Sequence, residues 1–315
     1  MNKKKLLYFI LCFCFFTMSA NAQVNEQESD SAKIYKDIHD LSKKSKFNKF
    51  IYKLLFRPSA LKVQNLIPEK NSKKQLLISK KASGKVIRNI TIETLDPFGY
   101  SIKNENRVPK NGIEKFGNSI HIKTKEFTIR NLILFRKNDL CDSLLLKETE
   151  RLIRSQRYVR EVSVTPVLIS TASDSIDIKI RVLDSWSLIP NGSLSGNQSS
   201  VKVTERNILG FGHQISGELE NKFSPKEQAV FAQYSVNNIK NSFIKLDLEY
   251  TNEYNNDSKR SVSLNRPFYS VIAKNAGGFY FENRTFTEQF PIADTLAAVA
   301  TQYEFQEYWY GRAFK

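Results

Sequence analysis

The sequence predicts an α+β domain followed by an antiparallel transmembrane β-barrel, and two observations predict this order. Between residues 85 and 184, the apolar residues pass from strand spacing to helical spacing and back, in the order β-α-α-β-β. From residue 185 to 315, segments of about ten residues alternate apolar and polar side chains between turn-forming clusters, as the strands of membrane barrels do. The length of 315 residues also favours two domains over one.

Residues 1–22 have the features of a secretory signal peptide. A basic start at 1–5 precedes an apolar run at 6–16, and Ala20-Asn21-Ala22 forms a small-x-small cleavage site. The apolar run is shorter than the about 20 residues that a helix needs to span a bilayer. We therefore expect export, with a mature chain that begins at Gln23. Cys141 is then its only cysteine, which excludes an intramolecular disulfide.

The next segment, 23–84, is strongly basic and predicts one helix that ends before Pro58. On this helix an apolar stripe lies beside a stripe of cations, namely Lys46, Lys49, Lys53 and Arg57. A basic amphipathic helix is suited to the surface of an anionic membrane. The alternative, a solvated linker helix packed on the following domain, fits the pattern equally well.

Residues 85–184 predict the elements of the α+β domain one by one. A first strand is expected at 85–92, followed by an inserted loop at 101–122 with a short extra strand at 119–123. Thr124 is the expected N-cap of a short helix, and Asp142 or Ser143 that of a second, amphipathic helix that ends near Arg154. The period then changes to two, which predicts strands at 159–168 and 176–184.

Residues 185–315 predict the barrel strands. Alternating segments recur at 212–222, 228–238, 242–252, 259–266, 277–287 and 302–314, and aromatic residues lie near their ends. Acids and lysines cost a few kcal/mol in hydrocarbon, so we expect them to face a polar lumen and the apolar set to face lipid. A soluble β-sandwich has similar short strands, but the signal peptide favours the barrel. The segment is long enough for about eight strands.

Several motifs resemble a known family. TKEFTIR at 124–130, the helix at 142–154, YVREV at 158–162 and VLDSW at 182–186 resemble a POTRA domain of the BamA/TamA superfamily of outer-membrane assembly factors. ERNILGFG at 205–212 resembles the segment that opens the barrel in that superfamily. The resemblance implies an outer-membrane protein whose N-terminal domain faces the periplasm. It also implies a barrel about twice as large as 185–315 provides, so we expect Lys315 to lie inside an incomplete barrel.

By this resemblance, the expected function is assembly or insertion of outer-membrane proteins, without enzyme activity. The exposed edge of strand 159–168 or 176–184 would accept an extended client peptide by β-augmentation. The first barrel strand, around 186–194, would be the corresponding edge for clients under insertion. The expected partners are the outer-membrane bilayer, unfolded outer-membrane clients and accessory periplasmic or lipoprotein subunits. The residues that mark the candidate client-binding edges are Val162, Val164, Ile176, Ile178 and Ile180.

Two other functions remain open. One is a secretion pore that exports a dedicated partner, and the other is an outer-membrane enzyme whose active site lies in the C-terminal half beyond this chain. The sequence contains no G-x-S-x-G elbow, Walker loop or H-E-x-x-H motif, and His39, His121 and His213 belong to different predicted elements. We therefore predict no cofactor and no metal site. Nucleic acid is a poor partner for an exported chain.

Overall fold

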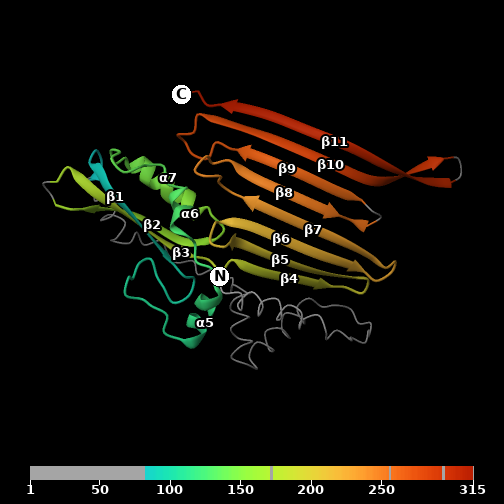
Figure 1. Cartoon of the computed structure of the whole chain (residues 1–315), viewed down its shortest axis with the longest axis horizontal. Helices are drawn as coiled ribbons and strands as arrows, with labels where there is room; N and C mark the ends of the chain where they lie inside the picture. The colour runs from blue at the N-terminus through green and yellow to red at the C-terminus, as the bar shows by residue number, and fades with distance from the viewer. Residues whose placement is uncertain (1–81, 171–172, 255–256, 293–294, 315) are drawn as a thin grey trace, which may run out of the picture. The chain divides into compact units, whose positions relative to one another are not determined.

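The computed structural model describes residues 82–170, 173–254, 257–292 and 295–314. All of them belong to one compact unit, Ala60–Lys315. The signal peptide and the predicted basic helix with Lys46, Lys49, Lys53 and Arg57 lie outside the described residues. The described part contains a small three-stranded sheet with helices and a large eight-stranded sheet (Figure 1).

The small sheet has the strand order β1-β3-β2. Strand β1 (Val86–Leu95) runs parallel to β3 (Ser175–Asp184), and β2 (Val159–Leu168) pairs with the other side of β3 in antiparallel fashion. A parallel pair needs a crossover connection, which here contains the helices. Strand β3 is therefore central, and β1 and β2 are the outer strands.

Helices α6 (Glu126–Arg130) and α7 (Ser143–Arg154) pack on one face of the small sheet. Every second residue of β3 from Ile176 to Val182 is fully buried there, and burial of each contributes roughly 1.5–3 kcal/mol. Asp142 caps α7 as predicted, because its carboxylate accepts a hydrogen bond from the backbone N–H of Leu144 (2.7 Å). The prediction for Thr124 was wrong, since Lys125 occupies the N-cap position of α6.

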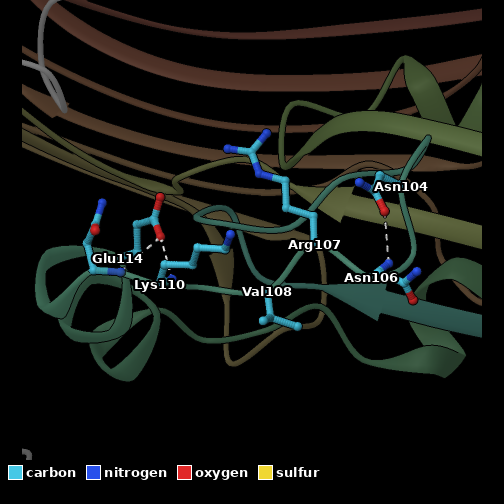
Figure 2. A pocket seen from close by; sticks show the side chains of 7 residues that line it. Asn104, Asn106, Arg107, Val108, Lys110 and Glu114 are labelled. Carbon is cyan, nitrogen blue, oxygen red and sulfur yellow. Dashed lines mark hydrogen bonds between the residues drawn. The ribbon is translucent and has the colours of Figure 1, made fainter.

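The inserted segment contains a helix, α5 (Gly112–Ile120), so the predicted extra strand at 119–123 was wrong. Glu114 decides the local structure, because its carboxylate accepts hydrogen bonds from the backbone N–H groups of Lys110 (2.9 Å) and Asn111 (3.4 Å). Figure 2 shows these bonds beside a pocket of about 380 Å³ between the loop and the start of α5. The capping acid outweighs the short apolar alternation of Ile120 and Ile122.

The large sheet consists of eight strands in sequence order, each antiparallel to its neighbours (Figure 1). Six of them overlap the predicted segments, and the first overlaps 186–194. The sheet is open: among the described residues, the outer strands β4 and β11 have no partner on their outer sides. The strands are β4 (Leu188–Leu194), β5 (Gln198–Ile208), β6 (His213–Lys222), β7 (Glu227–Val236), β8 (Lys245–Asn252), β9 (Ser258–Arg266), β10 (Asn275–Ile292) and β11 (Thr295–Arg312).

The register of the large sheet separates apolar from polar side chains. Residues opposite each other on adjacent strands share a face. One face therefore carries four residues that lie opposite one another on β7 to β10, namely Tyr234, Leu248, Val262 and Phe281. The same face carries Val201, Ile215 and Leu219. The other face carries Lys202, Glu218, Gln233, Glu249, Ser261 and Glu282. From β5 to β10 one face is thus mostly apolar and the other mostly polar, as the alternation predicted, whereas β11 is mixed, because Gln306 lies opposite Phe281 and Phe305 lies opposite Glu282.

Strands β10 and β11 continue past the rest of the sheet. Strand β9 pairs with β10 only as far as Thr285, whereas β10 and β11 pair with each other from Asn275 and Arg312 to Ile292 and Thr295. Beyond β9 the two strands form a ribbon of their own (Figure 1).

Candidate functional site

The ERNILGFG segment joins the small domain to the large sheet. It forms the turn between β5 and β6, in which Gly210 has a φ of +79° and Gly212 a φ of +70°. The carbonyl of Gly210 accepts hydrogen bonds from the backbone N–H of Lys125 (3.0 Å) and the hydroxyl of Thr128 (2.8 Å). A Cβ atom on Gly210 would lie 2.4 Å from the carbonyl oxygen of Lys123, so only glycine allows this approach.

Asn207 is the buried link within this junction. Its Nδ2 donates to the Thr124 hydroxyl (2.9 Å), and its Oδ1 accepts from the backbone N–H of Gly212 (2.8 Å). One side chain therefore holds the small domain and the turn of the sheet at the same time. A buried amide that lost these partners would be left unsatisfied, at a cost of about 1–3 kcal/mol.

Asp184, at the end of β3, fixes the segment that leads into α6. Its Oδ2 accepts from the backbone N–H of Thr124 (2.7 Å) and lies 3.1 Å from Nε2 of His121, with both side chains buried. This is the actual role of Thr124, in place of the predicted N-cap. Trp186 covers the cluster, with its ring centroid 6.2 Å from that of His121.

Two groups near this buried cluster have raised pKa values. Burial, together with the negative charge of Asp184, raises the pKa of Tyr158 well above its usual range. The Tyr158 ring also faces Gly212, where a Cβ atom would lie 2.8 Å from it. Burial likewise raises the pKa of Asp96, although the positive charge of Lys123 opposes the effect.

Helix α7 makes a second contact with the same end of the large sheet. Glu148 accepts a hydrogen bond from the hydroxyl of Ser270 (2.8 Å), and the guanidinium of Arg151 donates to the carbonyl of Tyr269. Hydrogen bonds from Arg151 and Ser270 lower the pKa of Glu148. Residues 269–270 lie between β9 and β10, whereas Asn207 lies at the end of β5. The small domain is therefore held at two separated places along one end of the sheet.

The strand edges differ from the prediction in one respect. Ile176, Ile178 and Ile180 lie on the central strand β3, which pairs on both sides, so the prediction that they mark a free edge was wrong. Val162 and Val164 do lie on an outer strand, β2. Their side chains are buried in the core, so a peptide at this edge would meet these two residues through their main-chain groups.

Pro166 determines which β2 groups face outward. It sits opposite Ile178 inside the β2–β3 ladder but has no N–H to donate, so its nitrogen faces the open side. In an antiparallel pair the N–H direction alternates along the strand. The N–H groups of Val162 and Val164, four and two residues away, therefore also face outward. The same reasoning applies to Pro190 on the outer strand β4.

The polar face of the large sheet carries ion pairs between neighbouring strands. Lys202 and Glu218 approach to 2.8 Å, and Lys259 pairs with Glu249. On the other face, that of Tyr234 and Ile215, His213 contacts the Tyr234 hydroxyl (2.7 Å) near the junction. Among the described residues, no three His, Cys, Asp or Glu side chains gather as a metal site, and no helix has the length and apolar character needed to span a bilayer.

Sequence reasoning placed ERNILGFG at the opening of the large sheet but missed what its side chains contact. The contact of Glu148 and Arg151 with residues 269–270 was also missed, because charged side chains on an amphipathic helix usually face solvent. No local signal in the sequence pairs positions more than a hundred residues apart.

No family model matches the chain, and no curated protein matches it in sequence. Solved structures with some similarity include BamA from Haemophilus ducreyi lacking POTRA domains 1–3, with 13% identity, a TM-score of 0.41, and coverage of 72% of this chain and 43% of that one. CdiB from Acinetobacter baumannii has 9% identity and a TM-score of 0.39, with coverage of 93% and 69%. CdiB from Escherichia coli has 7% identity and a TM-score of 0.35, with coverage of 93% and 66%.

This chain therefore spans less than half of the solved BamA chain. Because identities and TM-scores are low, the function proposed below rests on the residues and geometry of this chain.

Proposed function

We propose that the large sheet is part of the wall of an outer-membrane β-barrel and that the small domain is a periplasmic POTRA-type domain that receives unfolded outer-membrane proteins for assembly. The observation that carries the proposal is the two-faced, open sheet joined at one end to the small domain. The same proposal includes export of the chain, its insertion into the outer-membrane bilayer and its binding of unfolded client proteins.

The apolar face supports a membrane location. Leu219, Val201 and Ile215 are among its exposed side chains. Transfer of such surface from water to hydrocarbon is favourable by roughly 25 cal/mol per Å². The opposite face would line a polar lumen, where ion pairs such as Lys202 with Glu218 avoid the few kcal/mol that a charge costs at the lipid face. Within the sheet, antiparallel pairing satisfies the backbone groups, as a bilayer requires.

The outer strands support a role in receiving clients. An extended peptide that pairs with β2 would meet the outward N–H groups of Val162 and Val164, and the gap at Pro166 would limit the length of the added strand. Main-chain hydrogen bonds do not select a sequence, which suits a protein with many clients. The edge of β4 would offer the same kind of pairing within the membrane.

A secretion pore is the second candidate, because the same polar face would line a passage for an exported substrate. Depletion of the full-length protein in its native cells, followed by quantitative proteomics of the outer membrane, separates the candidates. Assembly predicts that several unrelated barrels fall together. A pore predicts loss of one exported partner with barrels at normal levels, and an enzyme predicts a change in lipid or polymer composition instead. Unaltered barrel levels would refute the assembly proposal.

A further inference from the structure

Helix α5 exposes an apolar stripe on its surface. Ile113, Phe116 and Ile120 are 45%, 54% and 53% exposed, and their spacing of three and four residues places them on one side of the helix. Gly117 is the only buried residue of the helix. Among the described residues, the small domain therefore covers the helix at Gly117 and leaves these three large apolar side chains about half exposed.

The exposure is fixed by contacts beside the stripe, at Gly117, and on the opposite side of α5, at Asn118. Gly117 packs so closely on the Phe98 ring that a Cβ atom would lie 2.7 Å from it. Asn118 exchanges two hydrogen bonds with the backbone of Phe98, one from the Phe98 N–H (3.1 Å) and one to its carbonyl (2.9 Å). With Glu114 capping the first turn, the helix cannot rotate its stripe inward without loss of these bonds.

The surroundings of the stripe are cationic. Residues 97–125 contain two acids, and both are engaged: Glu105 pairs with Lys179 (2.7 Å), and Glu114 caps the helix. Figure 2 shows Lys110 beside Glu114 at the start of the helix and Arg107 farther along the same pocket. Six exposed basic side chains belong to the same stretch, namely Lys103, Arg107, Lys110, Lys115, Lys123 and Lys125.

The end of helix α5 is followed directly in sequence by residues that contact the proposed barrel wall. Two residues after α5, the carbonyl of Ile122 lies 3.5 Å from Nδ2 of Asn207, which belongs to the turn at the end of β5. Thr124 follows, bound to Asp184 and Asn207. The helix is therefore anchored beside the end of the sheet where the small domain docks, which is the level at which a bilayer around the sheet would end.

We propose that α5 lies in the headgroup layer of the bilayer, with Ile113, Phe116 and Ile120 in its apolar boundary and the surrounding cations on anionic phospholipid headgroups. This inference rests on the proposed barrel. Amphipathic helices with a cationic surround bind membranes in this way, by buried apolar area together with attraction to anionic lipid. The helix would hold the small domain at a fixed height below the membrane.

The test places a fluorescent label on single cysteines in a chain without other thiols (Cys12→Ala, Cys14→Ala, Cys141→Ala). The full chain is reconstituted in phosphatidylcholine vesicles, with or without phosphatidylglycerol, that carry a lipid-bound nitroxide quencher. Phe116→Cys probes the stripe. Lys115→Cys, exposed on another side of the same helix, is its matched control. Leu219→Cys probes the apolar face of the large sheet.

We expect the lipid quencher to remove most of the fluorescence from the labels at 116 and 219 and little from the label at 115. Quenching at 116 should increase with phosphatidylglycerol and weaken when Lys110→Gln and Lys123→Gln are added. Quenching at 219 with none at 116 would overturn the helix proposal alone. No quenching at 219 would overturn the proposed barrel and the helix proposal with it. A label at 116 shielded from water but not quenched by lipid would indicate a protein partner and overturn the proposal.

Discussion

The side-chain amide of Asn207 donates to the hydroxyl of Thr124 across 83 positions of sequence, and this bond joins the small domain to the large sheet. We expect Asn207→Ala to loosen the junction by about 1–3 kcal/mol, because it leaves buried partners such as the Gly212 N–H without an acceptor. Limited proteolysis between residues 185 and 212 measures the effect. As a control, Asn197→Ala changes an exposed residue in the turn between β4 and β5. It should leave the rate of proteolytic cleavage unchanged. Equal rates for both variants would contradict the role given to Asn207.

Leu152→Asp should unfold the small domain. Leu152 is buried in the core beneath α7, and an unpaired carboxylate there costs several kcal/mol. Circular dichroism during thermal unfolding gives the measurement. Leu144→Asp is the control, because Leu144 lies on the same helix but is exposed. If the two variants unfold at the same temperature, the assignment of the buried face is incorrect.

Val164→Pro should weaken client capture while the small domain stays folded. It removes an outward N–H of β2 without touching the ladder to β3, since Pro166 already occupies an equivalent position. Val164→Ala keeps the N–H and loses side-chain packing, so it separates the two effects. Crosslinking of an unfolded barrel protein to the full-length chain reports capture. Equal capture by the proline and alanine variants would exclude β2 as the receiving edge.

The junction should weaken at high pH through Tyr158. Its pKa is raised in the folded state by burial and by the charge of Asp184, so the protonated form is favoured. The stabilisation is fully present below the unfolded pKa of about 10 and is lost as pH rises above it, at up to about 1.4 kcal/mol per pH unit. Unfolding monitored from neutral to strongly alkaline pH should show this slope. Tyr158→Phe should flatten it, and an unchanged slope would assign the effect to other groups.

Much of the fold follows from local patterns. Strict alternation along β3 and the helical spacing on α7 predict their type and ends closely, because burial of one face dominates both elements. Strand order does not follow from alternation. A strand with one apolar face looks the same in the centre of a sheet as at its edge, which is why Ile176, Ile178 and Ile180 were assigned to a free edge.

The errors in the candidate site have the same origin. The sequence identified 205–212 by its resemblance to the segment that opens the barrel in the BamA/TamA superfamily. It could not show that Thr124, Lys125 and Thr128 bind that turn, because these partners meet only after folding. Helix α5 was missed because a single capping acid, Glu114, outweighs the apolar alternation that follows it.

The ribbon of β10 and β11 has a bearing on how the whole chain is oriented. Asn275 and Arg312, at one end of the pair, lie on the side where Ser270 contacts α7, so Ile292 and Thr295 lie at the far end. The seven residue pairs from Phe286 and Thr301 onward extend beyond β9 by about 23 Å, at 3.3 Å per residue. If the sheet spans a membrane as proposed, the ribbon and the small domain lie on opposite sides of it. Detection of the ribbon at the cell surface would then place the small domain in the periplasm.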